Sequence, residues 1–241
     1  MTELLYQKDS YLKEFSTVVT AVDPENRAVQ LDKTAFYPGG GGQPYDMGVL
    51  IAGEMVYPLA RARKTADEVW HILAEGDQPL PEVGAAVTGK LDWERRYRLM
   101  RTHTAMHILC GVVFRDYGAQ VTGGDMEPLK GRMDFEFETM TRDLVEVIEK
   151  AVNEEVRNAR GVRVQILPRE EAFQIPDLIR TKINLLPPQI KEVRTVELVG
   201  LDLQADGGTH VANTSEVGPM HIVDYKSKGK INKRIYVELE E

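Results

Sequence analysis

The stretch WERRYRLMRTHTAMHILCGVVFRDYG, residues 93–118, separates two differently patterned parts of the chain. Its apolar residues recur with a helical period over the length of a long α-helix, and Gly118 suits the position just after a helix C-terminus. We therefore expect the first long helix here, with a different kind of structure on its N-terminal side.

The residues before this helix are expected to form strands. Short β-branched or alternating runs are separated by turn sequences such as DPEN and GGGGQP. The runs are FSTVVTAVD (15–23), AVQLDKTAFY (28–37), MGVLIAG (47–53), EMVYPLARA (54–62) and DEVWHILA (67–74). Regular short strands with no long helix between them predict a small β-barrel, which we assign to residues 1–91.

The remaining residues, 92–241, mix helices and strands. A second amphipathic helix is expected in TRDLVEVIEKAVNEEVRNARG (141–161), with Leu144, Ile148, Ala151 and Val152 on one side and Gly161 at its end. Strands are expected in RMDFEF (132–137), VRVQILP (162–168), EVRTVELVG (192–200), PMHIVDYK (219–226) and KRIYVELE (233–240). Long helices among mainly sequence-local strands predict an α+β fold.

Composition narrows the class of protein. The chain has 241 residues, of which 42% are apolar and 28% charged, as in soluble globular proteins. Cys110 is the only cysteine, so no intrachain disulfide can form, which fits a reducing cytoplasm. No apolar run approaches the roughly 20 residues that span a bilayer, and the N-terminus has no signal-peptide pattern. We expect a cytoplasmic protein that does not enter a membrane.

The charge is unevenly distributed. The net charge is −8, yet RRYRLMR (95–101) and KSKGKINKR (226–234) are strongly basic. Segregated basic clusters in an acidic protein indicate local binding of a polyanion, although each could also be a solvated face.

Two histidine motifs together suggest a metal site. HTAMH places His103 and His107 four residues apart on one helix face, and QADGGTHV (204–211) brings Asp206 and His210 together at a glycine turn. Each motif alone has an ordinary structural explanation, as two helical histidines or a common turn. Together they supply up to four ligands for Zn²⁺, three nitrogens and one oxygen. The pair is not an HExxH motif, because Thr104 stands where that motif has glutamate.

Other residues that could ligate a metal or act in catalysis are expected to have structural roles. We interpret His71 and His221 as packing histidines within strands, and Cys110 as a core residue. Asp134 could orient a metal-bound histidine from outside the ligand set, or it could be a solvated strand residue.

Three motifs carry a resemblance to a known family. RTHTAMHIL (101–109), GGTHV (207–211) and AFYPGGGGQPYDMG (35–48) resemble the alanyl-tRNA editing family, which comprises the editing domain of alanyl-tRNA synthetase and its free-standing AlaX relatives. The resemblance covers nearly the whole chain, and the length is similar to that of the medium-length AlaX type. It implies a small N-terminal β-barrel followed by an α/β two-layer editing domain of the alanyl/threonyl-tRNA synthetase type.

The resemblance also implies an activity. The family hydrolyses the ester of tRNA(Ala) mischarged with serine or glycine and spares Ala-tRNA(Ala). One Zn²⁺ per chain is implied, with His103, His107, Asp206 and His210 as ligands and the three histidines as catalytic residues. Asp206 stands where the family has cysteine. Aspartate is a competent but harder zinc ligand than thiolate.

The same resemblance assigns the substrate contacts, and the basic clusters supply the expected tRNA contacts. The glycine loop lies over the family's catalytic pocket, so the expected substrate-binding residues are Thr34, Gly40, Gly41, Gly42 and Gln43. For tRNA we expect the two basic clusters to contribute Arg95, Arg96, Arg98, Lys228, Lys230, Lys233 and Arg234. The expected partner is mischarged tRNA(Ala), and no obligate protein partner is evident.

Two alternatives come from different classes of protein. One is an RNA-binding module whose metal is structural. The other is a metal-dependent hydrolase of a small ester or amide, for which the basic clusters would be incidental. Parallel deacylation assays on Ser-tRNA and Ala-tRNA separate these hypotheses.

Overall fold

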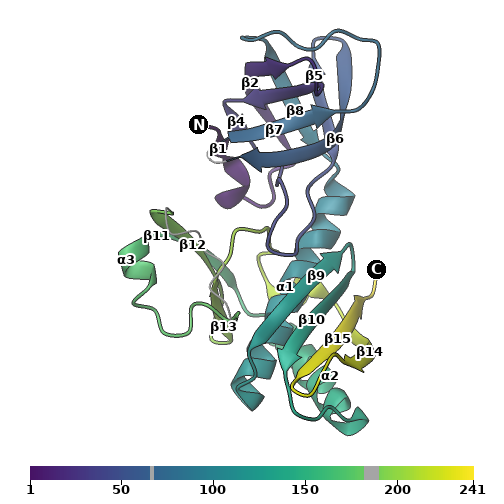
Figure 1. Ribbon diagram of the computed structural model, residues 1–241, viewed down its shortest axis with the longest axis vertical. Coiled ribbons are helices and arrows are strands. Elements are labelled where there is room, and N and C mark those ends of the chain that lie inside the picture. The colour runs from purple at the N-terminus through teal and green to yellow at the C-terminus, as the bar shows by residue number, and fades with distance from the viewer. Residues whose placement is uncertain (66–67, 182–189) are drawn as a thin grey trace. The chain divides into compact units, whose positions relative to one another are not determined.

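The computed structural model describes residues 1–65, 68–181 and 190–241, and Figure 1 shows its helices and strands. These residues fall into two compact units, Met1–Tyr97 and Arg98–Glu241. The division lies within the helix α1 (Trp93–Tyr117), whereas the boundary expected from the sequence follows residue 91. Strands dominate the first unit and helices mix with sheets in the second, which confirms the predicted α+β class.

The first unit contains a closed six-stranded barrel in the order β2-β3-β7-β6-β5-β8, with every neighbouring pair antiparallel. Its strands are β2 (Glu14–Asp23), β3 (Ala28–Leu31), β5 (Gly48–Ala52), β6 (Met55–Thr65), β7 (Glu68–Leu73) and β8 (Ala86–Leu91). A short parallel pair, β1 (Glu3–Leu4) with β4 (Lys33–Thr34), and the 3-10 turn η1 (Leu5–Gln7) accompany it. The predicted barrel is confirmed, although β8 was not among the predicted strands. Residue 67 of the predicted run DEVWHILA lies outside the described residues.

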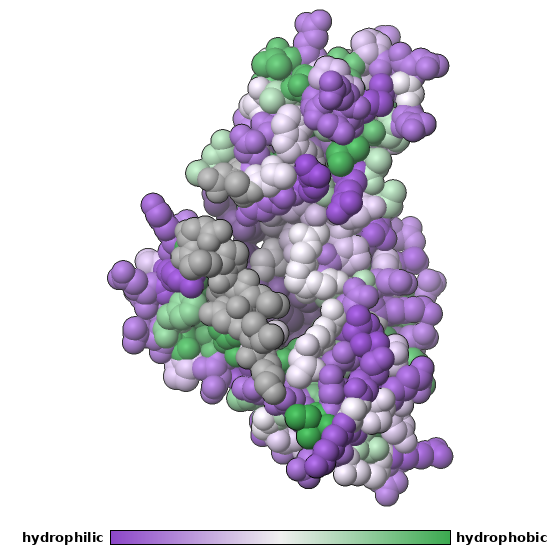
Figure 2. All heavy atoms as spheres, in the orientation of Figure 1, coloured by the Kyte–Doolittle hydropathy of each residue, from purple (hydrophilic) through white to green (hydrophobic). Residues whose placement is uncertain are grey.

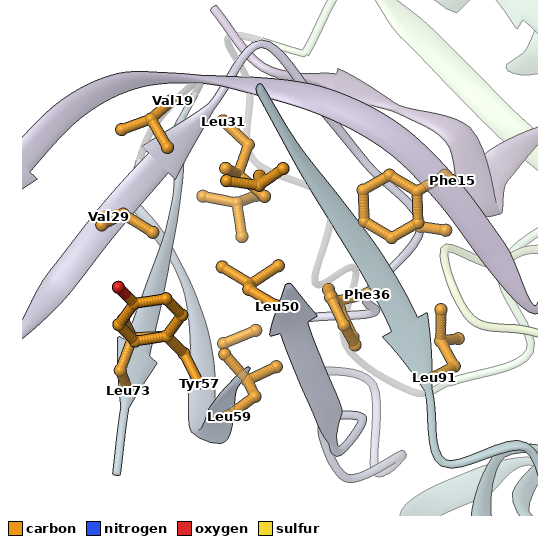
Figure 3. Packing of buried hydrophobic residues seen from close by; sticks show 14 residues of the cluster. Phe15, Val19, Val29, Leu31, Phe36, Leu50, Tyr57, Leu59, Leu73 and Leu91 are labelled. Carbon is orange, nitrogen blue, oxygen red and sulfur yellow. The ribbon is translucent and has the colours of Figure 1, made fainter. Parts of the chain in front are cut away.

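Alternating side chains fill the barrel. Along the first half of β2, exposed and buried residues alternate, as the two-residue period of a strand requires. Figure 3 shows apolar side chains from different strands pointing toward one another inside the barrel. The labelled residues are Phe15, Val19, Val29, Leu31, Phe36, Leu50, Tyr57, Leu59, Leu73 and Leu91. This cluster is the core of the first unit.

A buried ion pair fixes the start of α1 to the barrel loops within the first unit. Arg96 is fully buried, and its guanidinium donates to both carboxylate oxygens of Asp46. It also donates to the carbonyl oxygens of Ala35 (2.6 Å) and Ser10 (3.0 Å). The prediction that Arg96 contacts tRNA is therefore corrected, because its charge is committed inside the protein.

The described residues of the second unit form two antiparallel sheets. One has the order β14-β15-β10-β9, and the other the order β11-β12-β13. The strands are β9 (Val121–Glu127), β10 (Lys130–Glu136), β11 (Val162–Pro168), β12 (Glu192–Leu198), β13 (Asp202–Ala205), β14 (Met220–Ser227) and β15 (Asn232–Leu239). The remaining helical elements are α2 (Arg142–Arg157), α3 (Arg169–Ala172) and η2 (Thr214–Val217).

Both long helices pack on the four-stranded sheet. A Cβ atom at Gly131 of β10 would lie only 2.7 Å from the sulfur of Met106 on α1, so the Met106 side chain packs directly on the strand backbone. From α2, Asn153 donates to the carbonyl oxygen of Met220 at the start of β14 (2.7 Å). Helices on a sheet give the two-layer arrangement expected for this part of the chain.

Some local predictions were wrong. The helix α2 ends at Arg157 rather than at Gly161, and its N-cap is Thr141, whose hydroxyl accepts from the Leu144 amide. The side chain of His221 is 49% exposed and pairs with Glu240, so His221 is not a packing residue. The strands β9 and β13 lack clear alternation and were not predicted.

The surface that the structure describes is largely polar in the view shown. In Figure 2, hydrophilic side chains cover most of the visible face, and hydrophobic groups gather in a few separate spots. Among the described residues, no helix is long and apolar enough to cross a membrane.

Arg96→Ala is expected to destabilise the first unit by about 3–5 kcal/mol, because it leaves the buried Asp46 carboxylate without its cation. The chain's two tryptophans, Trp70 and Trp93, both lie in this unit, so their fluorescence during urea unfolding reports on it. Arg98→Ala is the control, because Arg98 is partly exposed and pairs with the exposed Glu241. It should change the unfolding free energy by less than about 1 kcal/mol. Equal stability of Arg96→Ala and the wild type would contradict the structural role of Arg96.

Candidate metal centre

The middle of α1 supplies two imidazoles from a buried position. Residues 102–113 of this helix are all buried, including His103 and His107. Their rings lie on one face, with centroids 5.2 Å apart. A buried polar ring must find partners within the protein, because water cannot reach it.

Those partners come from the segment that begins with β13. Directly after this strand, the amide of Asp206 donates to the carbonyl oxygen of Arg194 on β12 (3.0 Å), which continues the sheet pairing. The carboxylate Oδ2 of Asp206 then accepts from the amide of Gly208 (2.7 Å). This is an Asx-type turn, and it presents His210 four residues later.

The two halves converge on one point. The His210 ring lies 4.2 Å from that of His103 and 4.7 Å from that of His107, measured between centroids. The Nε2 atoms of His210 and His103 lie 3.1 Å and 3.5 Å from carboxylate oxygens of Asp206. One ligand atom from each of the four residues lies within 4.8 Å of every other. A tetrahedral Zn²⁺ with bonds of about 2.1 Å holds its ligand atoms about 3.4 Å apart, so the group fits such an ion.

Each imidazole is held from outside by a second hydrogen bond. Nδ1 of His107 lies 3.1 Å from Oδ2 of Asp202, and Nδ1 of His210 lies 3.2 Å from the hydroxyl of Thr104. His103 hydrogen-bonds the backbone of Thr209. With Nδ1 engaged in His107 and His210, Nε2 is the nitrogen left to face the centre.

Asp202 is the residue that the sequence analysis missed. The sequence analysis had considered Asp134 as the residue that orients a metal-bound histidine. Asp134 instead forms a bidentate ion pair with Arg234 (2.6 and 2.8 Å). A signal for Asp202 was present, since it lies four residues before Asp206 on an extended segment. Residues an even number apart share one face of a strand.

Burial and neighbouring charges set the protonation of the site. Burial lowers the pKa of His103 to about 4 and that of His210 well below its ordinary value. Burial also opposes charge on His107, but the hydrogen bond and charge of Asp202 outweigh it and raise the pKa of His107. Burial alone would raise the pKa of Asp206, yet the imidazoles of His103 and His210 hold it well below its ordinary value. At neutral pH, His103 and His210 are thus neutral and Asp206 is ionised, the forms that bind metals, whereas Asp202 favours the protonated form of His107.

Cys110 lies outside this group, as predicted for a core residue. Its side chain is buried, and desolvation raises the pKa of the thiol well above its ordinary value. A protonated, buried thiol is a poor nucleophile.

The predicted substrate-binding residues belong to the first unit. The hydroxyl of Thr34 is fully buried, bonds Nε2 of His71 (2.8 Å) and accepts from the amide of Phe36 (3.1 Å). Gly40 and Gln43 close a tight turn through reciprocal backbone hydrogen bonds of 3.0 and 2.9 Å. The four glycines at 39–42 all have positive φ, between 56° and 132°, which explains why the loop uses glycine.

The basic residues have different surroundings. Lys228 and Lys230 are exposed on the hairpin between β14 and β15. Lys233 is buried and its ammonium donates to the carbonyl oxygens of Gly229 (2.9 Å) and Lys230 (3.0 Å), so it stabilises the hairpin itself. Of the other predicted tRNA contacts, Arg234 pairs with Asp134, Arg98 with Glu241, and Arg95 donates to the carbonyl of Tyr45.

A β-barrel unit followed by an α/β unit with a His-His-Asp-His group is the combination expected of an aminoacyl-tRNA editing protein. Family comparisons agree with this class. The model described as "Threonyl and Alanyl tRNA synthetase second additional domain" matches residues 193–236. The model for class II (A) tRNA synthetases matches residues 6–95.

Full-length relatives define the family more narrowly. The chain is 42% identical over 238 residues to the alanyl-tRNA editing protein AlaX-M of Saccharolobus solfataricus, covering 98% of each protein. It is 37% identical over 244 residues to AlaX-M of Methanosarcina acetivorans, covering 99% of each. It is also 38% identical to the alanine–tRNA ligase of Ignicoccus hospitalis over 92% of this chain, but over only 24% of the ligase. The chain therefore belongs to the AlaX-M family of alanyl-tRNA editing proteins, and it is an enzyme of the aminoacyl-tRNA deacylase class.

Proposed function

We propose that the protein hydrolyses the ester bond of Ser-tRNA(Ala), and also of Gly-tRNA(Ala), in trans, and that it spares Ala-tRNA(Ala). The observation that carries this proposal is the convergence of three imidazoles and a carboxylate within a chain related over its full length to alanyl-tRNA editing proteins.

We propose Zn²⁺ as the metal, one per chain, held by His103, His107, Asp206 and His210. The donor set suits this ion, because neutral imidazole and carboxylate are ordinary zinc ligands. Bound zinc would supply Lewis acidity for the ester carbonyl or for an attacking water. The chain's own contribution is to hold three imidazoles and one carboxylate in a buried site, with two of the rings fixed through Nδ1. Asp206 would be the ligand to leave the metal and open a coordination position for water, because it lies on a turn rather than on the helix.

Discrimination against alanine needs a polar contact. Serine differs from alanine by one hydroxyl, and an apolar pocket rejects such an isostere by only about a hundredfold. We propose that Gln43 or Thr34, which flank the glycine loop, binds the serine hydroxyl, and that Gly40, Gly41 and Gly42 let the loop backbone approach the substrate.

A second function is favoured by one feature of the site. Four protein ligands form a closed shell, and closed shells are typical of structural zinc. The protein would then bind tRNA without turnover. A small-ester hydrolase is the third possibility, and it predicts no dependence on tRNA.

Deacylation of one tRNA(Ala) charged in parallel with serine, glycine or alanine tests these functions. We expect loss of the seryl and glycyl esters, little loss of the alanyl ester, and inhibition by a zinc chelator that added zinc reverses. Tight tRNA binding without turnover would support the structural-metal function. Equal hydrolysis of a seryl ester without tRNA would support the small-ester hydrolase.

Substitution of Asp206 should change zinc affinity in a fixed order. Competition with a chelator is expected to rank Asp206→Cys tightest, wild type next and Asp206→Ala weakest. Thiolate is the softer donor and suits Zn²⁺ better than carboxylate, whereas alanine leaves three imidazoles to hold the ion.

His103→Ala and His107→Ala provide the comparison for this series. Each should weaken zinc more than Asp206→Ala does, because each removes a ligand held on a rigid buried helix. Identical affinities of all three Asp206 forms would mean that this carboxylate does not contact the metal and serves only to form the turn.

We propose that the exposed lysines of the β14–β15 hairpin bind the tRNA backbone. The double variant Lys228→Ala/Lys230→Ala should raise KM for Ser-tRNA(Ala) and flatten its dependence on salt, because fewer counterions are released on binding. The turnover number should stay close to wild type. Lys130→Ala/Lys150→Ala is the control, since it makes the same change of charge elsewhere on the surface. A salt slope that both double variants share with the wild type would assign the hairpin lysines to solubility.

A further inference from the structure

Asp202 lies behind His107, on the side of the ring away from the candidate metal centre. Its side chain is fully buried, and its Oδ2 lies 3.1 Å from Nδ1 of His107. The same oxygen accepts from the side-chain Nε2 of Gln204 (2.6 Å), and Oδ1 accepts from Nε of Arg180 (3.2 Å). The carboxylate is therefore held on both oxygens.

The surroundings of Asp202 fix its position. A Cβ atom at Gly111, one turn beyond His107 on α1, would lie 3.0 Å from Cβ of Asp202 and 2.9 Å from Cγ of Leu201. Only glycine leaves room for β13 to approach the helix this closely. On the other side, the guanidinium of Arg180 lies 3.8 Å from the ring centroid of Phe114, also on α1.

This arrangement costs free energy that packing alone does not explain. A buried carboxylate and guanidinium lose hydration, and a hydrophobic pair of similar volume is often as stable. The ionised pair does provide a strong hydrogen-bond acceptor, the Asp202 carboxylate, for the Nδ1 proton of His107. An ionised carboxylate only accepts hydrogen bonds, so His107 must carry its proton on Nδ1 and direct the lone pair of Nε2 toward the centre.

We propose that Asp202 is a positioning residue of the metal centre, which fixes the orientation and tautomer of His107 and is itself held by Arg180 and Gln204. The inference rests on the proposed function only through its zinc site. It adds a residue that contacts neither metal nor substrate and acts through His107.

The three histidines differ in the group that hydrogen-bonds the ring on the side away from the centre. His210 is held by the neutral hydroxyl of Thr104, and His103 by a backbone group, whereas His107 has a carboxylate. A carboxylate makes the imidazole a stronger metal donor than a neutral partner does. Loss of the Asp202 charge should therefore weaken zinc more than loss of the Thr104 hydroxyl.

The test measures zinc affinity of the full-length protein by chelator competition. Asp202→Asn keeps the shape of the side chain and removes its charge, and it should bind zinc about 10- to 100-fold more weakly than the wild type. Thr104→Val should show a smaller loss. In the His107→Ala background, Asp202→Asn should cause little further change, because the residue through which it acts is gone. The visible spectrum of the Co²⁺-loaded protein gives a second readout of ligand geometry and should change in Asp202→Asn.

Asp134→Asn is the matched control. Asp134 is also a buried strand carboxylate paired with an arginine, but its partner is Arg234 on the four-stranded sheet. It should keep wild-type zinc affinity. A comparable loss of zinc affinity in Asp134→Asn would mean that removing any buried carboxylate disturbs the fold enough to weaken zinc binding, and it would overturn the inference. Should Asp202→Asn fail to fold, Gly111→Ala replaces it, because the added methyl pushes Asp202 away and keeps its charge; wild-type affinity in that variant would overturn the inference.

The outcomes also separate this inference from the proposed function. Zinc binding by the wild type with unchanged affinity and Co²⁺ spectrum in Asp202→Asn would overturn only the role of Asp202. A wild-type protein that binds no zinc would overturn both the metal assignment and the inference.

Discussion

The second unit depends on one constraint: two histidines lie in a helical segment that is buried on every side. Polar rings in such a position destabilise the fold unless the protein supplies hydrogen-bond partners. For His103 and His107 these partners come from one short stretch, residues 202–210, which follows more than ninety residues later in the chain. The contact that completes the core of this unit is therefore the contact that assembles the candidate metal centre.

Asp206 shows how a local requirement and a functional one can be met by the same side chain. Its Oδ2 accepts from the Gly208 amide, as a turn-forming aspartate does, and the same carboxylate faces the imidazoles of His103 and His210. A cysteine could ligate the metal but would cap the turn less well, because sulfur is a weak hydrogen-bond acceptor. If the centre binds zinc as proposed, aspartate at this position would exchange some preference for zinc for a better-stabilised turn.

The sequence predicted the barrel, both long helices and the four residues of the candidate centre, because each has a short-range pattern. Strand alternation, helical periodicity and the four-residue spacing of His103 and His107 are all visible locally. Residues whose roles depend on long-range contacts were not predicted correctly. Arg96 was placed in a tRNA-binding cluster by its neighbours, but Asp46, fifty positions away, decides its role. For Asp202, the even spacing from Asp206 placed it on the same strand face, but its contact with His107 depends on the close approach of Gly111, about ninety positions away.

Each carboxylate near the candidate metal centre has an arginine partner, and this pairing affects how strongly the site would attract a cation. Asp202 is paired with Arg180, and Arg194 lies 3.7 Å from Asp206 and donates to its backbone carbonyl (2.9 Å). The burial of two carboxylates is thus offset by two guanidinium groups from the same unit. A divalent cation would then bind without having to neutralise stranded acidic groups, unlike a cluster of carboxylates alone. Its affinity would come mainly from the orientation of the three nitrogens, which is why residues that hold the rings matter as much as the ligands themselves.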